Sequence, residues 1–161
     1  MNRFLQHGLC VLALGFAATQ ASATTTVTFV KPTEFTDIGF YSQESSAALN
    51  VLEQHFKILS EQYLAPNQNL KVEVLDVDLA GRIDYTSRRF RDKRVLRGGA
   101  DWPRMRFHYV LETDGKVVTD SEADIADMAY LNRISTRYSN TTYPHEMRML
   151  EDWFKATLSN K

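Results

Sequence analysis

The chain has 161 residues and a net charge of −1, and 43% of its residues are hydrophobic. That length suits one domain, and that hydrophobic content is compatible with a domain held together by its core. The total charge says little about partners, but the single cysteine, Cys10, restricts the chemistry. If the N-terminal segment is removed, the protein can form no disulfide, use no thiol nucleophile and build no cysteine metal site.

The N-terminal segment has the features of a secretory signal peptide. Arg3 precedes an apolar stretch over residues 9–18, and Ala21-Ser22-Ala23 fits the small-residue rule for cleavage. A transmembrane helix needs about 20 consecutive apolar residues, and this apolar stretch is shorter, so we expect no transmembrane segment. Residues 1–23 are therefore predicted to be a signal peptide. Residues 24–161 are predicted to form a single domain that is periplasmic or secreted.

The first part of this domain is predicted to be a strand followed by a helix. Residues 24–30 are rich in threonine and valine, which favours a short strand. Ser42 is the expected N-cap of the helix, and Pro66 marks its end. His55 lies on the charged flank of this helix and is expected at the surface. The apolar face of the helix comprises Ala48, Leu52, Phe56, Leu59 and Tyr63.

Three further strands are predicted from alternating apolar residues. Residues 70–79 change phase at Val74-Leu75, which indicates a β-bulge that leaves Asp76 and Asp78 facing outward. A second strand follows Pro103, with Met105, Phe107, Tyr109 and Leu111 on its buried face. Asp114-Gly115 predicts a two-residue hairpin that leads to an edge strand over residues 116–125.

The remaining segments are predicted to be a loop and two helices. Residues 82–93 contain few apolar side chains and are expected to form an exposed loop. A short helix is expected within residues 127–137, around Met128, Tyr130, Leu131 and Ile134. Thr142 is the expected cap of a final helix, with Pro144 in its first turn. The apolar face of this helix comprises Met147, Leu150, Trp153, Phe154 and Leu158. The order of elements predicts an α+β fold: a single mixed, mostly antiparallel four-stranded sheet with helices packed on one face.

Positive charge is concentrated between residues 82 and 106. Nine basic residues lie there against three aspartates: Arg82, Arg88, Arg89, Arg91, Lys93, Arg94, Arg97, Arg104 and Arg106. Guanidinium groups bind phosphate or carboxylate with two hydrogen bonds, and an adjacent indole can stack on a sugar. The candidate binding residues are Arg88, Arg89, Arg91, Arg94, Arg97 and Trp102.

In an exported protein the expected partner of this segment is an anionic envelope component, such as a lipid headgroup or lipopolysaccharide, and not nucleic acid. The simpler interpretation is a solvated loop whose charge is balanced by nearby aspartates, with Trp102 anchored in the core.

Other motifs give weaker support for catalysis. His145-Glu146 begins like the H-E-x-x-H zinc motif, but Met149 occupies the position of the second histidine. We therefore assign no catalytic residue, metal or cofactor. The alternative is a metal-dependent or acid–base hydrolase that uses Asp76, Asp78 and Asp101. A third possibility is an assembly partner of another envelope protein.

Four stretches carry a resemblance to a known family: LKVEVLDVDLAGRI, RVLRGGADWPRMRFHYVL, TDSEADIADMAYL and YPHEMRMLEDWF. They resemble the shared blocks of the domain of unknown function family 3016, small exported proteins of Gram-negative bacteria. The resemblance covers most of the chain after residue 23 and implies an envelope location and a single domain. It implies no activity and no catalytic residue. Together these observations favour a non-enzymatic binding module of the periplasm or envelope.

Overall fold

The computed structural model describes residues 23–39, 41–86, 93–133 and 137–159. Nearly all of the predicted signal peptide lies outside these ranges. So do Ile134 of the predicted short helix and three candidate binding residues, Arg88, Arg89 and Arg91. Among the described residues, no helix is long and apolar enough to cross a membrane.

A four-stranded sheet forms one layer of the molecule. Its strands are β1 (Thr24–Phe29), β2 (Gln68–Asp78), β5 (Arg104–Thr113) and β6 (Lys116–Ala126), in the spatial order β1-β2-β5-β6. β1 and β2 are parallel, whereas the β2–β5 and β5–β6 pairs are antiparallel. The prediction of a mixed, mostly antiparallel four-stranded sheet is confirmed.

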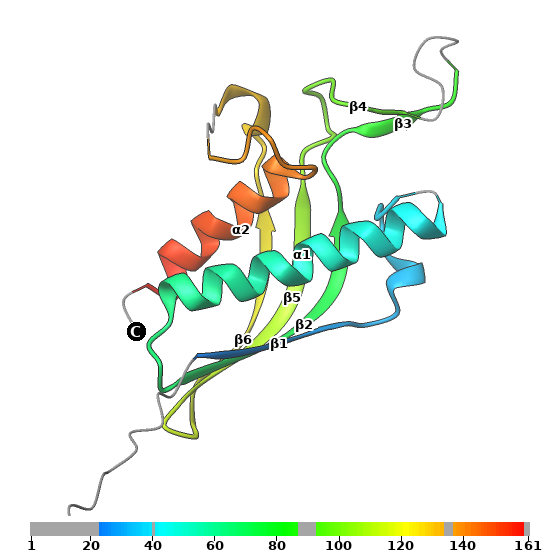
Figure 1. The fold of residues 1–161 in the computed structure, drawn as a ribbon. Helices are drawn as coiled ribbons and strands as arrows, with labels where there is room; N and C mark the ends of the chain where they lie inside the picture. The colour runs from blue at the N-terminus through cyan, green and yellow to red at the C-terminus, as the bar shows by residue number, and fades with distance from the viewer. Residues whose placement is uncertain (1–22, 40, 87–92, 134–136, 160–161) are drawn as a thin grey trace, which may run out of the picture.

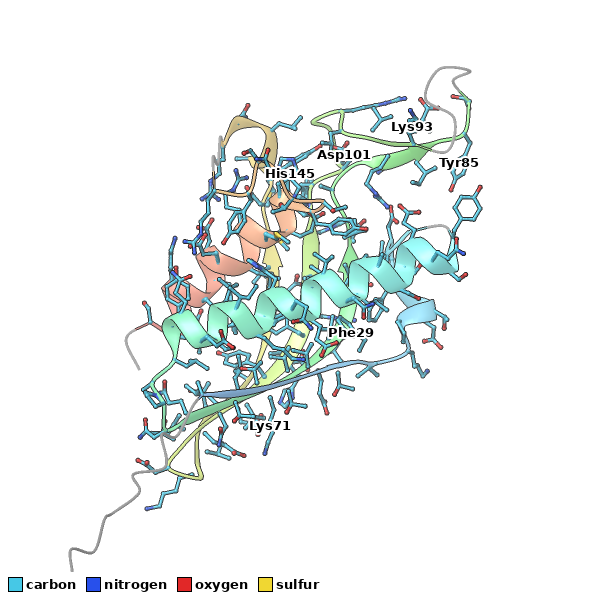
Figure 2. All side chains as sticks on the ribbon, viewed as in Figure 1. Phe29, Lys71, Tyr85, Lys93, Asp101 and His145 are labelled. Carbon is cyan, nitrogen blue, oxygen red and sulfur yellow. The ribbon has the colours of Figure 1, made fainter. Side chains whose placement is uncertain are left out.

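Two helices cover one face of this sheet. α1 (Ser42–Tyr63) connects the parallel strands β1 and β2, which need a crossover connection, and α2 (Pro144–Thr157) lies beside α1 on the same face (Figure 1). Side chains fill the space between the helices and the sheet (Figure 2). The ring of Phe107 on β5 lies 5.6 Å from Phe56 of α1 and 4.8 Å from Trp153 of α2, centroid to centroid. The α+β fold is therefore held by one core of aliphatic and aromatic side chains between the two layers.

Three local predictions for the strands are confirmed. The β2–β5 register shifts between Val74 and Asp76, where the bulge was expected. Asp114 and Gly115 have φ angles of 51° and 73°, as a two-residue hairpin with two left-handed positions requires. The alternation along β5 is also confirmed, because its odd-numbered apolar residues are buried: Met105, Phe107, Tyr109 and Leu111.

The predicted loop over residues 82–93 is wrong at both ends. β3 (Arg82–Asp84) and β4 (Lys93–Val95) form a two-stranded antiparallel hairpin beyond the main sheet. The Arg94–Asp37 ion pair attaches β4 to the segment before α1, and the Arg97–Asp84 ion pair attaches the loop after β4 to β3. Local apolar periodicity could not predict the hairpin, because charged contacts hold it in place.

Three predictions about helices also need correction. His55 is buried, with only 4% of its surface exposed, because its ring packs against α2 and Nε2 lies 2.8 Å from the Met147 carbonyl oxygen. The N-cap positions are Tyr41 and Tyr143, each one residue away from the predicted Ser42 and Thr142, and neither makes a side-chain capping bond. The described part of residues 127–137 contains only a 3₁₀ turn, η2 (Tyr130–Asn132).

Candidate functional site

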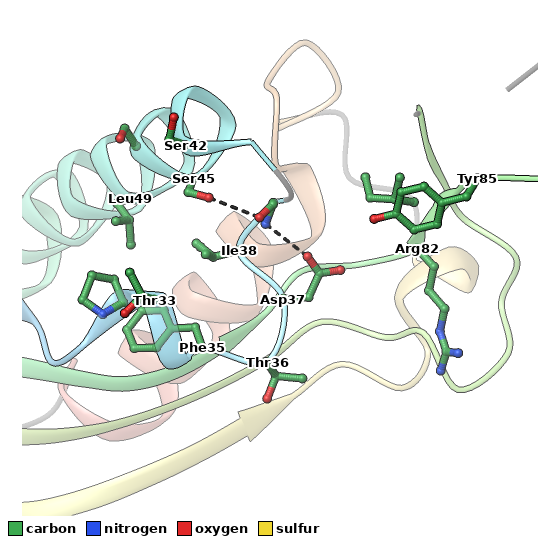
Figure 3. A pocket seen from close by; sticks show the side chains of 14 residues that line it. Thr33, Phe35, Thr36, Asp37, Ile38, Ser42, Ser45, Leu49, Arg82 and Tyr85 are labelled. Atoms are coloured by element: carbon green, nitrogen blue, oxygen red, sulfur yellow. Dashed lines mark hydrogen bonds between the residues drawn. The ribbon is translucent and has the colours of Figure 1, made fainter. Parts of the chain in front are cut away.

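A groove with a volume of about 770 Å³ lies between the segment before α1 and the β3–β4 hairpin. Phe35, Ile38, Leu49 and Ile83 give its lining an apolar character. Arg82 and Tyr85 extend from the hairpin side, opposite the residues that precede α1 (Figure 3). Both Arg82 and Tyr85 are exposed, and Arg82 Nη2 donates to the Ala100 carbonyl oxygen at 3.3 Å. The groove therefore combines an apolar floor with a polar rim that includes one arginine.

The wall before α1 is held in place by backbone contacts with β2. Asp37 N–H donates to the Val77 carbonyl oxygen at 2.9 Å, and Leu79 N–H donates to the Asp37 carbonyl oxygen at 3.0 Å. The Asp37 carboxylate also accepts a hydrogen bond from Gly39 N–H at 3.1 Å. Gly39 has a φ angle of 110°, and a Cβ atom there would lie 2.8 Å from Glu44. Glycine is therefore required at this turn, which directs the chain from the groove wall into α1.

Arg94 connects the two walls of the groove. Its Nη1 and Nη2 atoms donate to the two Asp37 carboxylate oxygens at 2.9 and 2.8 Å, and Nη1 also contacts the Gly81 carbonyl oxygen at 3.2 Å. Burial lowers the pKa of Arg94, but hydrogen bonds and the negative charge of Asp37 outweigh it and raise the pKa. This predicted binding residue is thus occupied by a two-bond ion pair and positions the hairpin.

Arg97 and Asp101 organise the loop that follows the hairpin. Arg97 Nη2 donates to Asp84 at 2.9 Å, and its backbone N–H donates to Asp101 at 2.9 Å. The Tyr130 hydroxyl donates to the other Asp101 oxygen at 2.9 Å. Burial raises the pKa of Asp101, but the hydrogen bonds from Arg97 and Tyr130 outweigh it and hold the pKa below its usual value. A second pocket of about 530 Å³ lies here, and Arg82 lines both pockets.

The three aspartates proposed for a hydrolase do not line a common pocket. Asp76 and Asp78 line a cleft of about 260 Å³, whereas Asp101 lines the pocket beside Arg97. Asp76 accepts hydrogen bonds from the backbone and hydroxyl of Thr36 at 2.7 and 2.8 Å. Asp78 accepts a hydrogen bond from Arg104 Nε at 3.1 Å. Within the described residues, no group of three or more His, Cys, Asp or Glu side chains is arranged to hold a metal ion.

Trp102 lies apart from the groove. It is half-buried, and the Arg104 guanidinium carbon lies 5.8 Å from the centre of its ring. Attractive contact between a guanidinium and an indole face occurs at this distance. Trp102 therefore contacts an arginine of β5 and does not line the groove.

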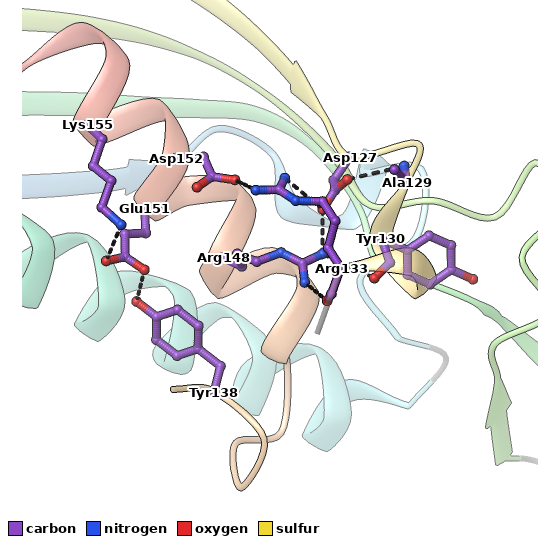
Figure 4. Close-up of polar contacts among 9 residues, drawn as sticks. All are labelled: Asp127, Ala129, Tyr130, Arg133, Tyr138, Arg148, Glu151, Asp152 and Lys155. Atoms are coloured by element: carbon purple, nitrogen blue, oxygen red, sulfur yellow. Dashed lines mark hydrogen bonds and ion pairs between the residues drawn. The ribbon is translucent and has the colours of Figure 1, made fainter. Parts of the chain in front are cut away.

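Buried charges on α2 make polar contacts away from the groove, in separate groups around Arg148 and Glu151. Arg148 donates to Asp127 at 2.6 Å and to the Tyr130 carbonyl oxygen at 3.1 Å, and Glu151 accepts a hydrogen bond from the Tyr138 hydroxyl at 2.9 Å (Figure 4). Burial raises the pKa of Glu151, but hydrogen bonds from Lys155, Tyr138 and Tyr63 outweigh it and lower the pKa. These contacts attach the segment before α2 to the helix, which is a structural task.

A known protein family matches most of the chain. The sequence model of the family described as Protein of unknown function (DUF3016) matches residues 23–156. The chain belongs to this family. The DUF3016 match includes both walls of the groove and confirms the resemblance found in the sequence. No curated protein and no solved structure matches the chain.

Sequence reasoning missed most of the groove in this DUF3016 protein. Phe35 and Ile38 belong to a stretch that reads as an aromatic loop, and Leu49 falls outside the main apolar stripe of α1. Arg82 belongs to the basic segment but was not among the predicted binding residues. The one sequence feature that could have indicated the groove was the presence of both an aromatic loop, which contains Phe35 and Ile38, and a basic segment, which contains Arg82. Their contact through Asp37 and Arg94 spans 57 positions in the sequence and follows from no local pattern.

Proposed function

We propose that this protein is an exported, non-enzymatic binding module whose groove receives an anionic amphiphile of the cell envelope. The ligand class is a phosphorylated lipid headgroup with adjoining apolar chain, as in lipopolysaccharide or an anionic phospholipid. The observation that carries the proposal is the open groove of about 770 Å³, with an apolar floor and Arg82 at its rim. Ligand pockets of this size are commonly apolar with a few polar groups that orient the ligand.

The chemistry of the two walls supports this ligand class. Phe35, Ile38 and Leu49 offer apolar contact, and Arg82 offers a guanidinium group that suits phosphate. Arg88, Arg89 and Arg91 belong to the segment that connects β3 with β4, so the sequence attaches three further positive charges to the same hairpin. Arg94 and Arg97 support the hairpin through ion pairs with Asp37 and Asp84.

Export is the part of the proposal that rests on the N-terminal sequence. Cleavage after Ala23 would leave β1 intact, because that strand begins at Thr24. Protein recovered from a periplasmic extract is therefore expected to begin at Thr24, which intact-mass measurement would establish. Exported protein that still carried Met1 would contradict the signal-peptide assignment.

Binding is tested by co-sedimentation with phosphatidylglycerol vesicles and with neutral vesicles. We expect binding to the anionic vesicles at low salt, and weaker binding at physiological salt, where exposed charges are screened beyond about 8 Å. Arg82→Gln should weaken the association about fivefold, since a basic residue near an anionic surface contributes about 1 kcal/mol. Arg106→Gln is the matched control, because Arg106 is an exposed arginine of β5 that does not line the groove. Equal effects of the two variants, or no binding at low salt, would contradict the proposal.

A further inference from the structure

The two edges of the sheet differ in their protection against pairing with another strand. β6 carries Lys116, Asp120, Glu122 and Asp124, and the β5–β6 register shifts between Leu111 and Glu112. β1 has the sequence TTTVTF, with no charge and no proline, and its register with β2 runs without a shift. Charges and bulges are the usual means by which edge strands avoid intermolecular pairing. β1 has neither.

The outer side of β1 presents free backbone groups. Among the described residues, β2 is the one strand that pairs with β1, which runs along the near edge of the sheet (Figure 1). Val30 N–H donates to the Val74 carbonyl oxygen at 2.9 Å, so the backbone N–H and C=O groups of the even-numbered residues of this segment point toward β2. Backbone groups alternate in direction along a strand, and the N–H and C=O groups of Thr25, Val27 and Phe29 therefore point away from the sheet.

The side chains next to this edge are apolar and incompletely covered. Val27 and Phe29 lie on the helix side of β1 and pack against the core but remain half-exposed. Phe35 contacts Phe29 with ring centroids 6.4 Å apart and is also half-exposed. A strand added at β1 would cover these apolar side chains as well as the free backbone groups.

We propose that β1 pairs antiparallel with β1 of a second copy of this chain. Residues directly opposite each other in an antiparallel pair share one face of the sheet, and a two-fold axis at Val27 meets this condition. The two Val27 residues then lie opposite one another, Thr25 lies opposite Phe29, and Thr26 lies opposite Thr28. The pairing uses the backbone groups that β2 leaves free and joins two four-stranded sheets into one continuous sheet.

The chemistry of β1 favours a second copy over an unrelated strand. Thr24, Thr26 and Thr28 lie on the exposed face of the strand. Thr25, Val27 and Phe29 lie on the helix side, so a two-fold axis at Val27 places residues of the same face opposite one another. Threonine pairs and pairs of β-branched residues are favourable across antiparallel strands. The interface lies along the β1 edge and does not require a ligand in the groove.

Sedimentation velocity over a range of concentrations tests the pairing in the protein as purified. We expect a monomer–dimer equilibrium that the double variant Thr26→Lys/Thr28→Lys weakens at least tenfold, because it places like charges opposite one another across the two-fold axis. The matched control is Val117→Lys/Val118→Lys, which adds two charges at exposed positions of β6. At a concentration where the wild-type protein is monomeric, both variants should melt at its temperature, since all four positions are exposed.

Amide exchange in the wild-type protein gives a second readout that needs no variant. Protection of the Thr25, Val27 and Phe29 amides should increase with protein concentration, while Thr26 and Thr28 remain protected at every concentration. A monomer at all concentrations, or exchange of the odd-numbered amides that is independent of concentration, would overturn the proposal. Dissociation by the Val117/Val118 variant in place of the Thr26/Thr28 variant would assign the interface to β6 and would overturn it equally.

Discussion

Glu146 is a carboxyl group whose surroundings differ strongly from those of a surface residue. It lies in the first turn of α2 with 2% of its surface exposed, and it accepts a hydrogen bond from Ala80 N–H at 2.7 Å. Burial raises the pKa of Glu146, and hydrogen bonds from the Ala80 and Glu146 N–H groups and the charge of Arg94 oppose that effect without cancelling it. The contact connects the start of α2 to the end of β2, so the protonation state of this residue affects how the layers are joined.

Replacement of Glu146 by glutamine should change the pH dependence of stability. A carboxyl group whose pKa is raised on folding contributes stability at low pH, and loses it as the pH rises from the ordinary value of 4.5 through the folded pKa. Glutamine does not ionise, and its carbonyl oxygen can still accept the hydrogen bond from Ala80. The melting temperature of Glu146→Gln relative to wild type should therefore increase as the pH rises above about 4.5.

The comparison must be made as a difference between the two proteins at each pH. The pKa values of Asp101 and Glu151 are lowered, so these groups contribute stability that is lost as the pH falls, in the opposite direction to Glu146. Both groups are present in wild type and variant, and their contributions cancel in the difference. A difference in melting temperature that stays constant from pH 4 to pH 8 would show that Glu146 titrates normally.

At the scale of elements, β5 connects the sheet to both helices. Phe107 contacts Phe56 of α1 and Trp153 of α2, whereas the neighbouring Arg106 is exposed on the opposite face of the sheet. The side chains of β5 that face the helices therefore stabilise the fold, whereas those on the exposed face contribute little to the free energy of unfolding. This division follows from the period of two along a strand.

Substitutions on the two faces of β5 should have unequal effects on stability. Phe107→Ala should lower the free energy of unfolding by about 3–5 kcal/mol, because it leaves a cavity among aromatic rings. Arg106→Ala should change it by less than about 0.5 kcal/mol, as is usual for exposed positions. Chemical denaturation of both variants measures the two values. Similar shifts of the two midpoints would contradict the assignment of faces.

The elements that could be predicted from the sequence are those determined by neighbouring residues. The alternation of β5, the bulge after Val74 and the turn at Asp114-Gly115 each depend on a few adjacent positions. The β3–β4 hairpin depends on the Arg94–Asp37 pair, and the burial of His55 depends on Met147, which is 92 positions away. The groove could therefore not be predicted from the sequence, because it depends on contacts between distant segments. The arginine at its rim, Arg82, nevertheless lies in the basic segment that the charge distribution identified as a candidate binding segment.

For the whole molecule, the two-layer arrangement places the groove and the basic hairpin at one end of the sheet. The Asp114-Gly115 turn lies at the opposite end, as Figure 1 shows from the positions of β3–β4 and of the turn between β5 and β6. A ligand in the groove should leave the opposite end of the sheet unaffected. Residues of the Asp114-Gly115 turn can therefore serve as an internal control in a binding experiment.

Chemical-shift mapping during a titration with phosphatidylglycerol bicelles is the most direct test of the proposed binding site. We predict salt-sensitive changes that are largest at the backbone amides of Ile38, Leu49, Arg82 and Tyr85, which line the groove. The amides of Asp114, Gly115 and Val117 should remain unchanged. Shifts concentrated at that opposite turn, or no shifts at low salt, would contradict the account.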